Sequence, residues 1–180
     1  HGDTDIDSLL AAVDVSVVAI CTPPQAHRDL ALAAIRAGKH LFMEKPPTLS
    51  AAAISEVADA ARAAGVFVLA GSHHPYRENV VELRRRIAAG ELGEVYAVDC
   101  FKMRRDAAPI DPGGDSPGMG VAAYSSIHRI DVALFLLGNP AVAYVTARVY
   151  NHFTLAKSRR EGVAQPSGAV EDSLIATIHF

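Results

Sequence analysis

The chain has 180 residues, of which 50% are hydrophobic and 21% are charged, a composition typical of a globular protein with a hydrophobic core. The formal net charge is −3, so there is no basic excess to suggest a nucleic-acid-binding protein or a segment that binds anionic lipid. The apolar runs are much shorter than the roughly 20 residues of a membrane-spanning helix. The two cysteines, Cys21 and Cys100, stand far apart and form no metal or redox spacing, so we interpret them as buried, reduced thiols of a cytoplasmic protein and not as a disulfide.

Alternating strands and helices are predicted for the first part of the chain. Residues 15–20 form a continuous apolar, β-branched run, which is typical of a strand buried on both faces. Periodicity, capping residues and glycine stops predict four further elements: a helix over 27–37 that ends at Gly38, a strand over 40–43, a helix from the N-cap Ser50 to about residue 64 that ends at Gly65, and a strand over 66–70. Such alternation with tight connections predicts a parallel sheet with right-handed crossovers.

The pattern changes after Gly71. The remaining sequence predicts, in order, a helix over 78–89, a half-exposed strand over 94–104, a loop over 106–118, a helix over about 119–137, and strands over 142–152 and 173–180. These last strands are expected to form an open, mainly antiparallel sheet. The expected fold class is therefore α/β, with a parallel-sheet domain over residues 1–72 and an α+β domain over residues 73–180.

The two ends of the sequence are expected to be internal positions of a longer chain. A doubly wound domain that opens on a strand such as 15–20 should have earlier βα units, and two units of about thirty residues place about sixty residues upstream of His1. At the other end, the last predicted strand reaches Phe180 with no turn after it.

The segment Glu44-Lys45-Pro46 carries the candidate chemistry. It follows a predicted parallel strand, and open α/β sheets bind ligands at the carboxyl ends of their strands. Pro46 keeps Lys45 out of helical geometry, and a lysine in a partly desolvated cleft can donate or share a proton near neutral pH. The alternative is an ordinary surface turn, and spacing alone does not separate the two.

A series of short motifs runs through nearly the whole chain: Ile20-Cys21-Thr22-Pro23-Pro24, His27, Ala37-Gly38-Lys39-His40, Glu44-Lys45-Pro46, Glu91-Leu92-Gly93-Glu94-Val95, His128-Arg129-Ile130-Asp131 and Leu136-Leu137-Gly138. Their order and spacing resemble the glucose–fructose oxidoreductase, inositol dehydrogenase and rhizopine-catabolism (Gfo/Idh/MocA) family. The resemblance implies that residues 1–72 are the C-terminal half of a Rossmann-type dinucleotide-binding sheet. It also implies that residues 73–180 belong to a substrate-binding and oligomerisation domain.

The resemblance implies an NAD- or NADP-dependent oxidoreductase that moves a hydride between nicotinamide and a hydroxyl-bearing carbon of a sugar, inositol or related polyol. Lys45 would reach the substrate hydroxyl, and His128 would be the acid/base, so both side chains would converge on one crevice. The cofactor-binding residues would be Thr22, Pro23, Pro24, His27, Glu44, Lys45 and His73. By resemblance alone, the sheet of the second domain would join copies into a dimer or tetramer.

Tyr124 departs from the family pattern, because members usually carry an aspartate four residues before the histidine. Residues three or four apart share a helix face, so the predicted helix presents Tyr124, His128 and Asp131 together as a substrate-binding group. Tyr124 either takes part in a catalytic proton relay with Lys45 or only packs and hydrogen-bonds to substrate. His128 has its own alternative, that of a buried core histidine.

A glycine pattern over residues 118–123 matches the dinucleotide fingerprint G-x-G-x-x-A. That fingerprint requires a preceding strand, whereas Asp111-Pro112-Gly113-Gly114 predicts a loop, so these glycines are interpreted as the entrance to the helix that bears His128. The pair His73-His74 raises the idea of a metal site. No third ligand stands at zinc spacing, so no metal is predicted.

Two other functions stay open beside the dehydrogenase. Some relatives use nicotinamide for transient oxidation during glycoside hydrolysis, and others are non-catalytic, sugar-responsive regulators that bind dinucleotide. Lys45 and His128 argue against a regulator, and Tyr124 argues weakly for one. Because the Gly-rich turn that holds pyrophosphate is expected upstream, the isolated 180 residues are expected to bind nicotinamide negligibly.

Overall fold

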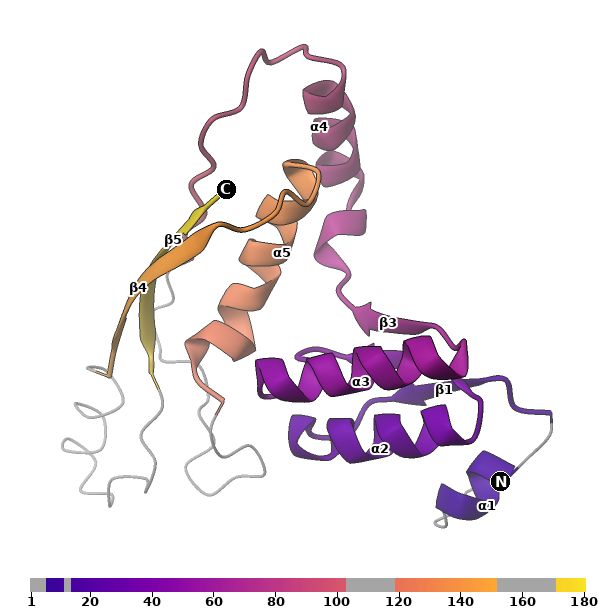
Figure 1. Ribbon diagram of the computed structural model, residues 1–180. Helices are drawn as coiled ribbons and strands as arrows, with labels where there is room; N and C mark the ends of the chain where they lie inside the picture. The colour runs from indigo at the N-terminus through magenta and orange to yellow at the C-terminus, as the bar shows by residue number, and fades with distance from the viewer. Residues whose placement is uncertain (1–5, 12–13, 103–118, 152–170) are drawn as a thin grey trace. The chain divides into compact units, whose positions relative to one another are not determined.

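A computed structural model describes residues 6–11, 14–102, 119–151 and 171–180 of the chain (Figure 1). The chain divides into two compact units, His1–Gly71 and Ser72–Phe180, each described by itself below. Within the described ranges, no helix combines the length and the apolar character needed to cross a bilayer.

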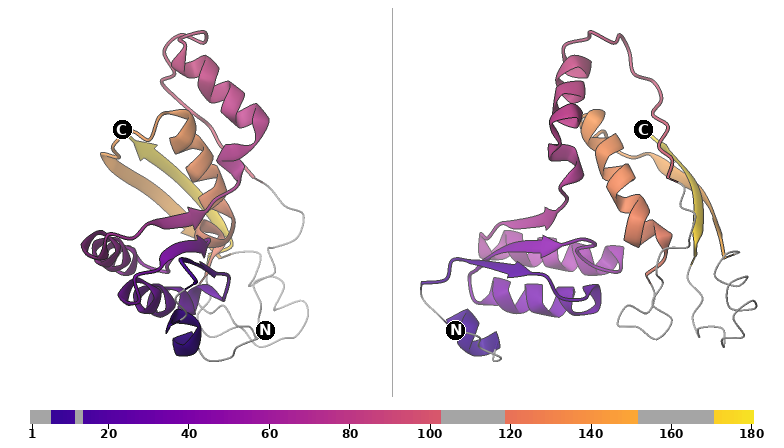
Figure 2. Two further views of the ribbon diagram at one scale, coloured as in Figure 1. Left: turned by 90° about the vertical axis from the view of Figure 1, so that its right-hand side faces the viewer. Right: turned by 180° about the vertical axis from the view of Figure 1, so that it is seen from behind.

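The first unit is a parallel sheet with helices on one face. In chain order it contains α1 (Ile6–Ala11), β1 (Val17–Ile20), α2 (Pro24–Arg36), β2 (His40–Glu44), α3 (Ala51–Ala64) and β3 (Val68–Gly71). The three strands are parallel in the order β1-β2-β3. Both crossovers step in the same direction across the sheet, so right-handed connections place α2 and α3 on the same face (Figures 1 and 2).

The hydrophobic core lies between this sheet and its helices. Leu41 and Met43 of β2 point into it, and its other buried apolar members are Leu10, Ile20, Ala31, Ala34, Ile35, Val57 and Ala61. The opposite sheet face is open in the described unit: Val17 is 56% exposed, Phe42 39% and Leu69 55%. The prediction that the first strand is buried on both faces is therefore wrong for Val17–Ile20, because the described helices cover one face only.

The ends of α3 confirm the predicted caps. The Ser50 hydroxyl accepts a hydrogen bond from the Ala53 amide at 3.2 Å, which satisfies one of the free N–H groups at the start of the helix. Gly65 closes the helix in the left-handed region with φ 66°, a conformation that favours glycine. Both signals are local in sequence, which is why they predict the helix boundaries correctly.

The second unit combines helical elements with an antiparallel ribbon. It contains the 3₁₀ turn η1 (His74–Tyr76), α4 (Glu78–Ala88), the π-helical turn η2 (Ala122–Ser126), α5 (Ile127–Leu136), β4 (Tyr144–Tyr150) and β5 (Ser173–His179). The helices α4 and α5 contact each other and η1. β4 and β5 pair antiparallel from Tyr144–His179 to Tyr150–Ser173. Together with the parallel sheet of the first unit, this confirms the expected α/β class.

One predicted strand is absent from the part of the second unit that the structure describes. Residues 94–102 form no strand, so the prediction of a strand over 94–104 is wrong for them. A strand is defined by its ladder of hydrogen bonds to a neighbour, and alternation of apolar and polar residues does not supply that neighbour. The loop predicted over 106–118 lies outside the described residues.

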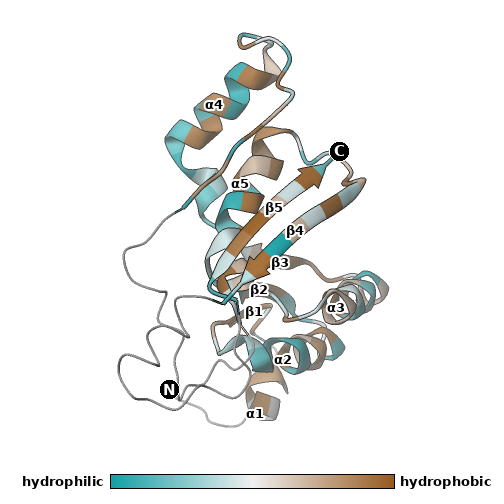
Figure 3. Ribbon diagram, turned by 90° about the vertical axis from the view of Figure 1, so that its left-hand side faces the viewer, coloured by the Kyte–Doolittle hydropathy of each residue, from teal (hydrophilic) through white to brown (hydrophobic). Residues whose placement is uncertain are grey.

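The ribbon of β4 and β5 has one apolar face. The register places Val145, Ala147, Val149, Leu174, Ala176 and Ile178 on the same side, because alternate residues of paired strands share a face. Val145 is 54% exposed and Val149 59%. In the hydropathy colouring of Figure 3, brown (hydrophobic) segments occur along both strands.

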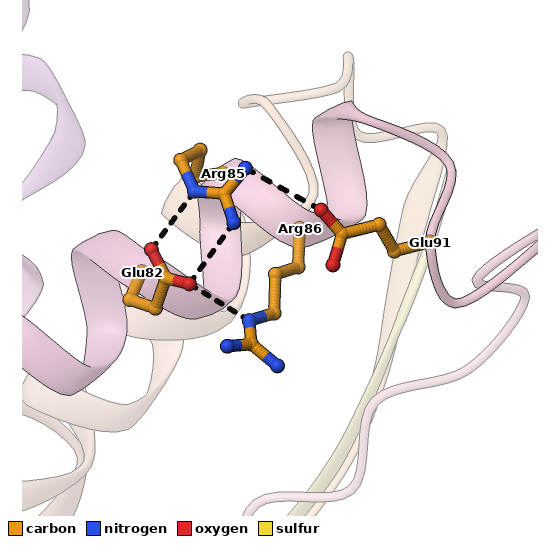
Figure 4. A network of polar contacts seen from close by, with 4 residues as sticks. All are labelled: Glu82, Arg85, Arg86 and Glu91. Atoms are coloured by element: carbon orange, nitrogen blue, oxygen red, sulfur yellow. Dashed lines mark hydrogen bonds and ion pairs between the residues drawn. The ribbon is translucent and has the colours of Figure 1, made fainter.

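An exposed network of ion pairs lies on α4 (Figure 4). Glu82 accepts hydrogen bonds from Arg85 at 2.9 Å and from Arg86 at 2.8 Å, and Arg85 also reaches Glu91 at 3.4 Å. The hydrogen bonds from these two arginines lower the pKa of Glu82 to about 2. Arg84 differs from its neighbours, because its guanidinium lies 4.2 Å from the centre of the Phe135 ring of α5.

The two cysteines are exposed free thiols. The expectation that both are buried is therefore wrong. Cys21 follows the end of β1 and Cys100 lies in the segment without regular structure after α4, so neither side chain points into a packed layer.

Candidate functional site

The carboxyl ends of β1 and β2 bring two loops to one edge of the parallel sheet. β1 is followed by Cys21-Thr22-Pro23 and β2 by Lys45-Pro46-Pro47, with a cis peptide bond between Lys45 and Pro46. Thr22 and Pro23 are exposed, whereas Lys45 is half-buried. Ligands of open α/β sheets bind at this edge, so the predicted cofactor residues of the first unit lie where such a ligand would be held.

His27 joins these two loops. Its side chain is fully buried at 0% exposure in the first turns of α2. Its Nδ1 lies 2.9 Å from the Pro46 carbonyl oxygen, and its Nε2 lies 2.8 Å from the Thr22 carbonyl oxygen. A neutral imidazole can donate one of these hydrogen bonds and an imidazolium can donate both. We call this pair of contacts the His27 bridge.

The His27 bridge gives His27 an indirect part in the predicted cofactor binding. Both ring nitrogens face backbone oxygens and the ring is enclosed, so the side chain has no polar atom left for a ligand. Any effect of His27 on a bound dinucleotide therefore passes through Thr22 and Pro46, whose positions the ring fixes.

Glu44 stabilises the turn that it begins. Its carboxylate Oε2 accepts a hydrogen bond from the Lys45 amide at 3.0 Å. Glu44 pairs in register with Gly71 at the end of β3. A side chain at position 71 would place a Cβ 3.1 Å from the Met43 carbonyl oxygen and 3.1 Å from the Phe42 ring, so glycine allows β3 to end close beside β2.

Three imidazole rings gather in the second unit, and we call them the imidazole cluster: His73, His74 and His128. The centres of His74 and His128 are 4.4 Å apart with an interplanar angle of 18°, a stacked pair. His73 lies 4.5 Å from His74 and 5.5 Å from His128, tilted against both. The cluster forms because η1, which begins at His74, contacts α5, which carries His128.

Charges around the imidazole cluster favour an uncharged His74. Burial is the first cause that lowers the pKa of His74, followed by the positive charges of Arg77, His73, Arg129 and Lys102. The predicted substrate residue Asp131 takes part in a different contact, because its carboxylate accepts a hydrogen bond from the Ser72 hydroxyl. This contact ties α5 to the residue that precedes the cluster.

The helix that bears His128 begins against Glu171. The Val121 amide donates to the Glu171 carbonyl oxygen at 2.9 Å, and the Ala122 amide donates to its carboxylate at 3.0 Å. A side chain at position 120 would overlap the Glu171 carboxylate. This contact accounts for the glycine at position 120 without any role in binding a phosphate. Sequence reasoning missed Glu171, because the residue lies about fifty positions from its partners and in no motif.

Tyr124 lies in the π-helical turn η2, where its amide donates to the Gly120 carbonyl oxygen at 2.9 Å. The expected grouping of Tyr124 with His128 assumes regular α-helical spacing up to the histidine. A π-helical turn has more residues per turn, so that spacing does not hold in the turn before His128. The grouping therefore stays a prediction.

The site residues predicted from the sequence are divided between the two units. Thr22, Pro23, Pro24, Glu44 and Lys45 lie at the sheet edge of the first unit, and His73, Tyr124, His128 and Asp131 lie in the second unit. Because Lys45 and His128 belong to different units, their convergence on one crevice stays a prediction. Within the described ranges, no group of three or more His, Cys, Asp or Glu residues is arranged to hold a metal ion.

Two family models match the chain. Residues 3–72 match the model described as the NAD-binding Rossmann fold of the Gfo/Idh/MocA oxidoreductase family. Residues 84–180 match the model described as the C-terminal alpha/beta domain of the same family. One match falls in each unit of the chain, and residues 73–83 lie between the two matches.

Characterised relatives agree with these matches. The chain is 33% identical to the D-glucoside 3-dehydrogenase of Escherichia coli K12 over 98% of its own length and 52% of that protein. It is 34% identical to the inositol 2-dehydrogenase of Rhizobium meliloti 1021 over 79% of its length and 42% of that protein. The chain thus spans about half the length of the curated relatives it matches.

Solved structures repeat the same architecture. GenD2 from gentamicin A biosynthesis, solved in complex with NAD, is 25% identical with a TM-score of 0.75, covering 99% of this chain and 48% of that protein. Levoglucosan dehydrogenase, solved with NADH and levoglucosan, is 23% identical with a TM-score of 0.78, over 99% of this chain and 48% of that protein. At this identity, the second likeness is one of fold.

Proposed function

The chain belongs to the Gfo/Idh/MocA oxidoreductase family, and from that membership we propose that it is part of an NAD-dependent dehydrogenase that oxidises a hydroxyl group of a sugar, inositol or related polyol. The observation that carries the proposal is the sheet edge of the first unit. There Lys45 follows β2 in a turn whose next carbonyl, that of Pro46, is held by the buried ring of His27. A cation on a fixed turn at this edge suits a ligand with hydroxyl groups.

The residues at this edge fit a dinucleotide. Thr22 and Pro23 offer an exposed loop after β1, and Glu44, the last residue of β2, and Lys45, which follows it, offer a half-buried carboxylate and a half-buried ammonium group. When bound, the nicotinamide supplies the hydride acceptor. The family description names NAD, and GenD2, at 25% identity, was solved with NAD, which supports NAD over NADP.

The proton chemistry is assigned to the chain's own residues. The Lys45 ammonium donates a hydrogen bond to the substrate hydroxyl and holds it in place. A ring nitrogen of His128 accepts the hydroxyl proton as the carbon gives up its hydride. Tyr124 and Asp131 are assigned to substrate binding, Tyr124 by a hydrogen bond from its hydroxyl.

The test is made on the protein that contains this chain together with its flanking residues. We expect reduced nicotinamide to accumulate in a one-to-one ratio with oxidised substrate when NAD is supplied with a panel of sugars, inositols and polyols. Net glycoside cleavage without accumulation of reduced nicotinamide would instead identify a hydrolase. Binding of NAD without any turnover would identify a regulator.

Substitutions at the two central residues then test their roles. Lys45→Met and His128→Asn are each expected to lower kcat by roughly 10²–10⁴-fold, the usual contribution of a positioned acid or base. Arg62→Met is the control, because Arg62 is an exposed cation of α3 paired only with Asp59 among the contacts described. Wild-type turnover in His128→Asn would remove the histidine from the mechanism.

A further inference from the structure

The stacked pair of His74 and His128 is held by more than the two rings. His74 opens η1 and is followed by Pro75, which is buried and has a restricted backbone. The turn contacts α5, and the Ser72 hydroxyl donates to Asp131 of the same helix. The His74 ring is therefore presented to α5 from a fixed piece of backbone.

The geometry of the pair decides what His74 can do for its neighbour. Imidazole N–H groups lie in the plane of the ring and donate along that plane. At an interplanar angle of 18° and a distance of 4.4 Å, the rings of His74 and His128 lie face to face. Face-to-face rings cannot hydrogen-bond to each other, so His74 is placed to pack against His128 and not to exchange a proton with it.

The charged and titratable neighbours of His74 come from each element packed against it. Arg77 and His73 lie on its own segment, His128 and Arg129 on α5, and Lys102 on the segment after α4. The acid on α5, Asp131, is engaged by the Ser72 hydroxyl. Partial burial and the positive neighbours both lower the pKa of His74 and so disfavour its protonation. The ring turns its aromatic face to His128.

We propose that His74 is a positioning residue for His128. Its ring lies flat against the imidazole of His128 and fixes the plane in which the two nitrogens of that histidine point. This inference rests on the proposed acid/base role of His128, and His74 acts only through that residue. An aromatic ring of any kind at position 74 should therefore serve, whereas a side chain without a flat face should not.

The stacking is tested first by NMR on His128, independently of turnover. A ring stacked on another shifts the resonances of its ring protons upfield. We expect this shift for His128 in the wild type and in His74→Phe, and its loss in His74→Ala. His179→Ala is the matched control, since it removes an imidazole stacked 4.1 Å from Tyr144 in the same unit. An unshifted His128 in the folded wild type overturns the proposal.

Kinetics test the consequence for catalysis. We expect kcat of His74→Ala to fall roughly 10- to 100-fold, the scale of a misplaced catalytic group, while KM for NAD changes little and His74→Phe restores kcat. A loss in His74→Phe equal to that in His74→Ala overturns the proposal, because it would make the proton of His74 the important feature. His74→Leu, which keeps bulk without flatness, replaces the alanine variant if that variant unfolds.

The two proposals fail in different ways. If the wild type turns over no substrate, the proposed function fails, while the NMR shifts still report on the stacked rings. If His128→Asn is inactive but His74→Ala keeps wild-type kcat, the dehydrogenase stands and the positioning role of His74 is wrong.

Discussion

At the scale of single residues, the side chain of His27 links two loops of the first unit. Its ring sits between the Thr22 and Pro46 carbonyl oxygens and is fully buried. In His27→Phe, the buried Pro46 carbonyl would lose its partner, and a buried polar group left unsatisfied costs about 1–3 kcal/mol. We expect urea unfolding to show a loss of stability of that size.

A graded series sharpens this test. His27→Gln keeps one donor group, so its stability should lie between those of the wild type and His27→Phe. His27→Phe should also raise KM for NAD, because the two loops proposed to hold the dinucleotide lose their shared anchor. Equal stability of the wild type and the phenylalanine variant would contradict the structural importance of the His27 bridge.

The lowered pKa of His74 predicts a pH dependence of stability. In the folded chain this ring takes up a proton at lower pH than the 6.5 of an unperturbed histidine. Between the folded pKa and 6.5, the unfolded chain binds more protons, so stability falls as the pH falls. The stability associated with the neutral His74 ring is fully present above pH 6.5 and is lost as the pH falls from 6.5 through the folded pKa.

The measurement compares unfolding midpoints of the wild type and His74→Phe above and below pH 6.5. Phenylalanine does not titrate, so the variant should lose less stability than the wild type on acidification. Identical slopes for the two proteins would mean that the ring titrates alike in the folded and unfolded chains.

At the scale of elements, the start of the His128 helix is held by a residue about fifty positions away in the sequence. Glu171 accepts hydrogen bonds from the Val121 and Ala122 amides. Glu171→Ala removes the carboxylate that accepts from the Ala122 amide and keeps the main-chain carbonyl that accepts from the Val121 amide. Replacing a side-chain cap with alanine costs about 0.5–2 kcal/mol, and we expect chemical unfolding to show that Glu171→Ala loses this much stability.

A double-mutant cycle tests whether Gly120 is small because of Glu171. Gly120→Ala alone would push a methyl group into the carboxylate, whereas in the Glu171→Ala background the space is free. We expect the glycine substitution to cost less in that background. Strictly additive effects would show that the two residues act independently.

Elements that follow local rules are predictable from this sequence, and elements that depend on distant partners are less so. Ser50 and Gly65 predict the ends of α3, because a cap is decided within one turn. The strand expected over 94–104 fails over 94–102, because alternation says nothing about pairing. The π-helical turn before α5 also carries no signal in the apolar pattern, and it changes the expected neighbours of Tyr124.

The candidate site divides in the same way. The sequence motifs identify Lys45 and His128. They do not identify the contacts that hold these residues in position, because those contacts join residues far apart in the sequence. The Pro46 contact of His27 and the stacking of His74 on His128 join residues 19 and 54 positions apart. The doublet His73-His74 is visible in the sequence, but only the fold shows which of its rings lies flat on His128.

At the scale of the whole molecule, the β4–β5 ribbon carries an apolar face that is exposed among the residues the structure describes. Val145 and Val149 are more than half exposed there, and we propose this face as an association surface, because large exposed apolar patches often serve that role. The expected oligomer through the second-domain sheet would use such a face. We expect Val149→Lys to lower the molecular mass measured by light scattering at a given concentration.

The opposite strand face provides the control. Thr146 lies between Val145 and Ala147 on β4 and points to the other side of the ribbon. Thr146→Lys adds the same charge and should leave the mass unchanged. A folded Val149→Lys protein with the wild-type mass would place the subunit interface elsewhere.

The His27 bridge also has a consequence for how this protein can be altered. Both of its acceptors are main-chain oxygens, so the bridge is indifferent to the side chain at position 22. Thr22 is exposed and can be randomised to retune ligand preference while the anchored loops keep their course. Position 22 can therefore be varied in engineering experiments without disturbing the backbone of the two loops, provided that His27 is kept.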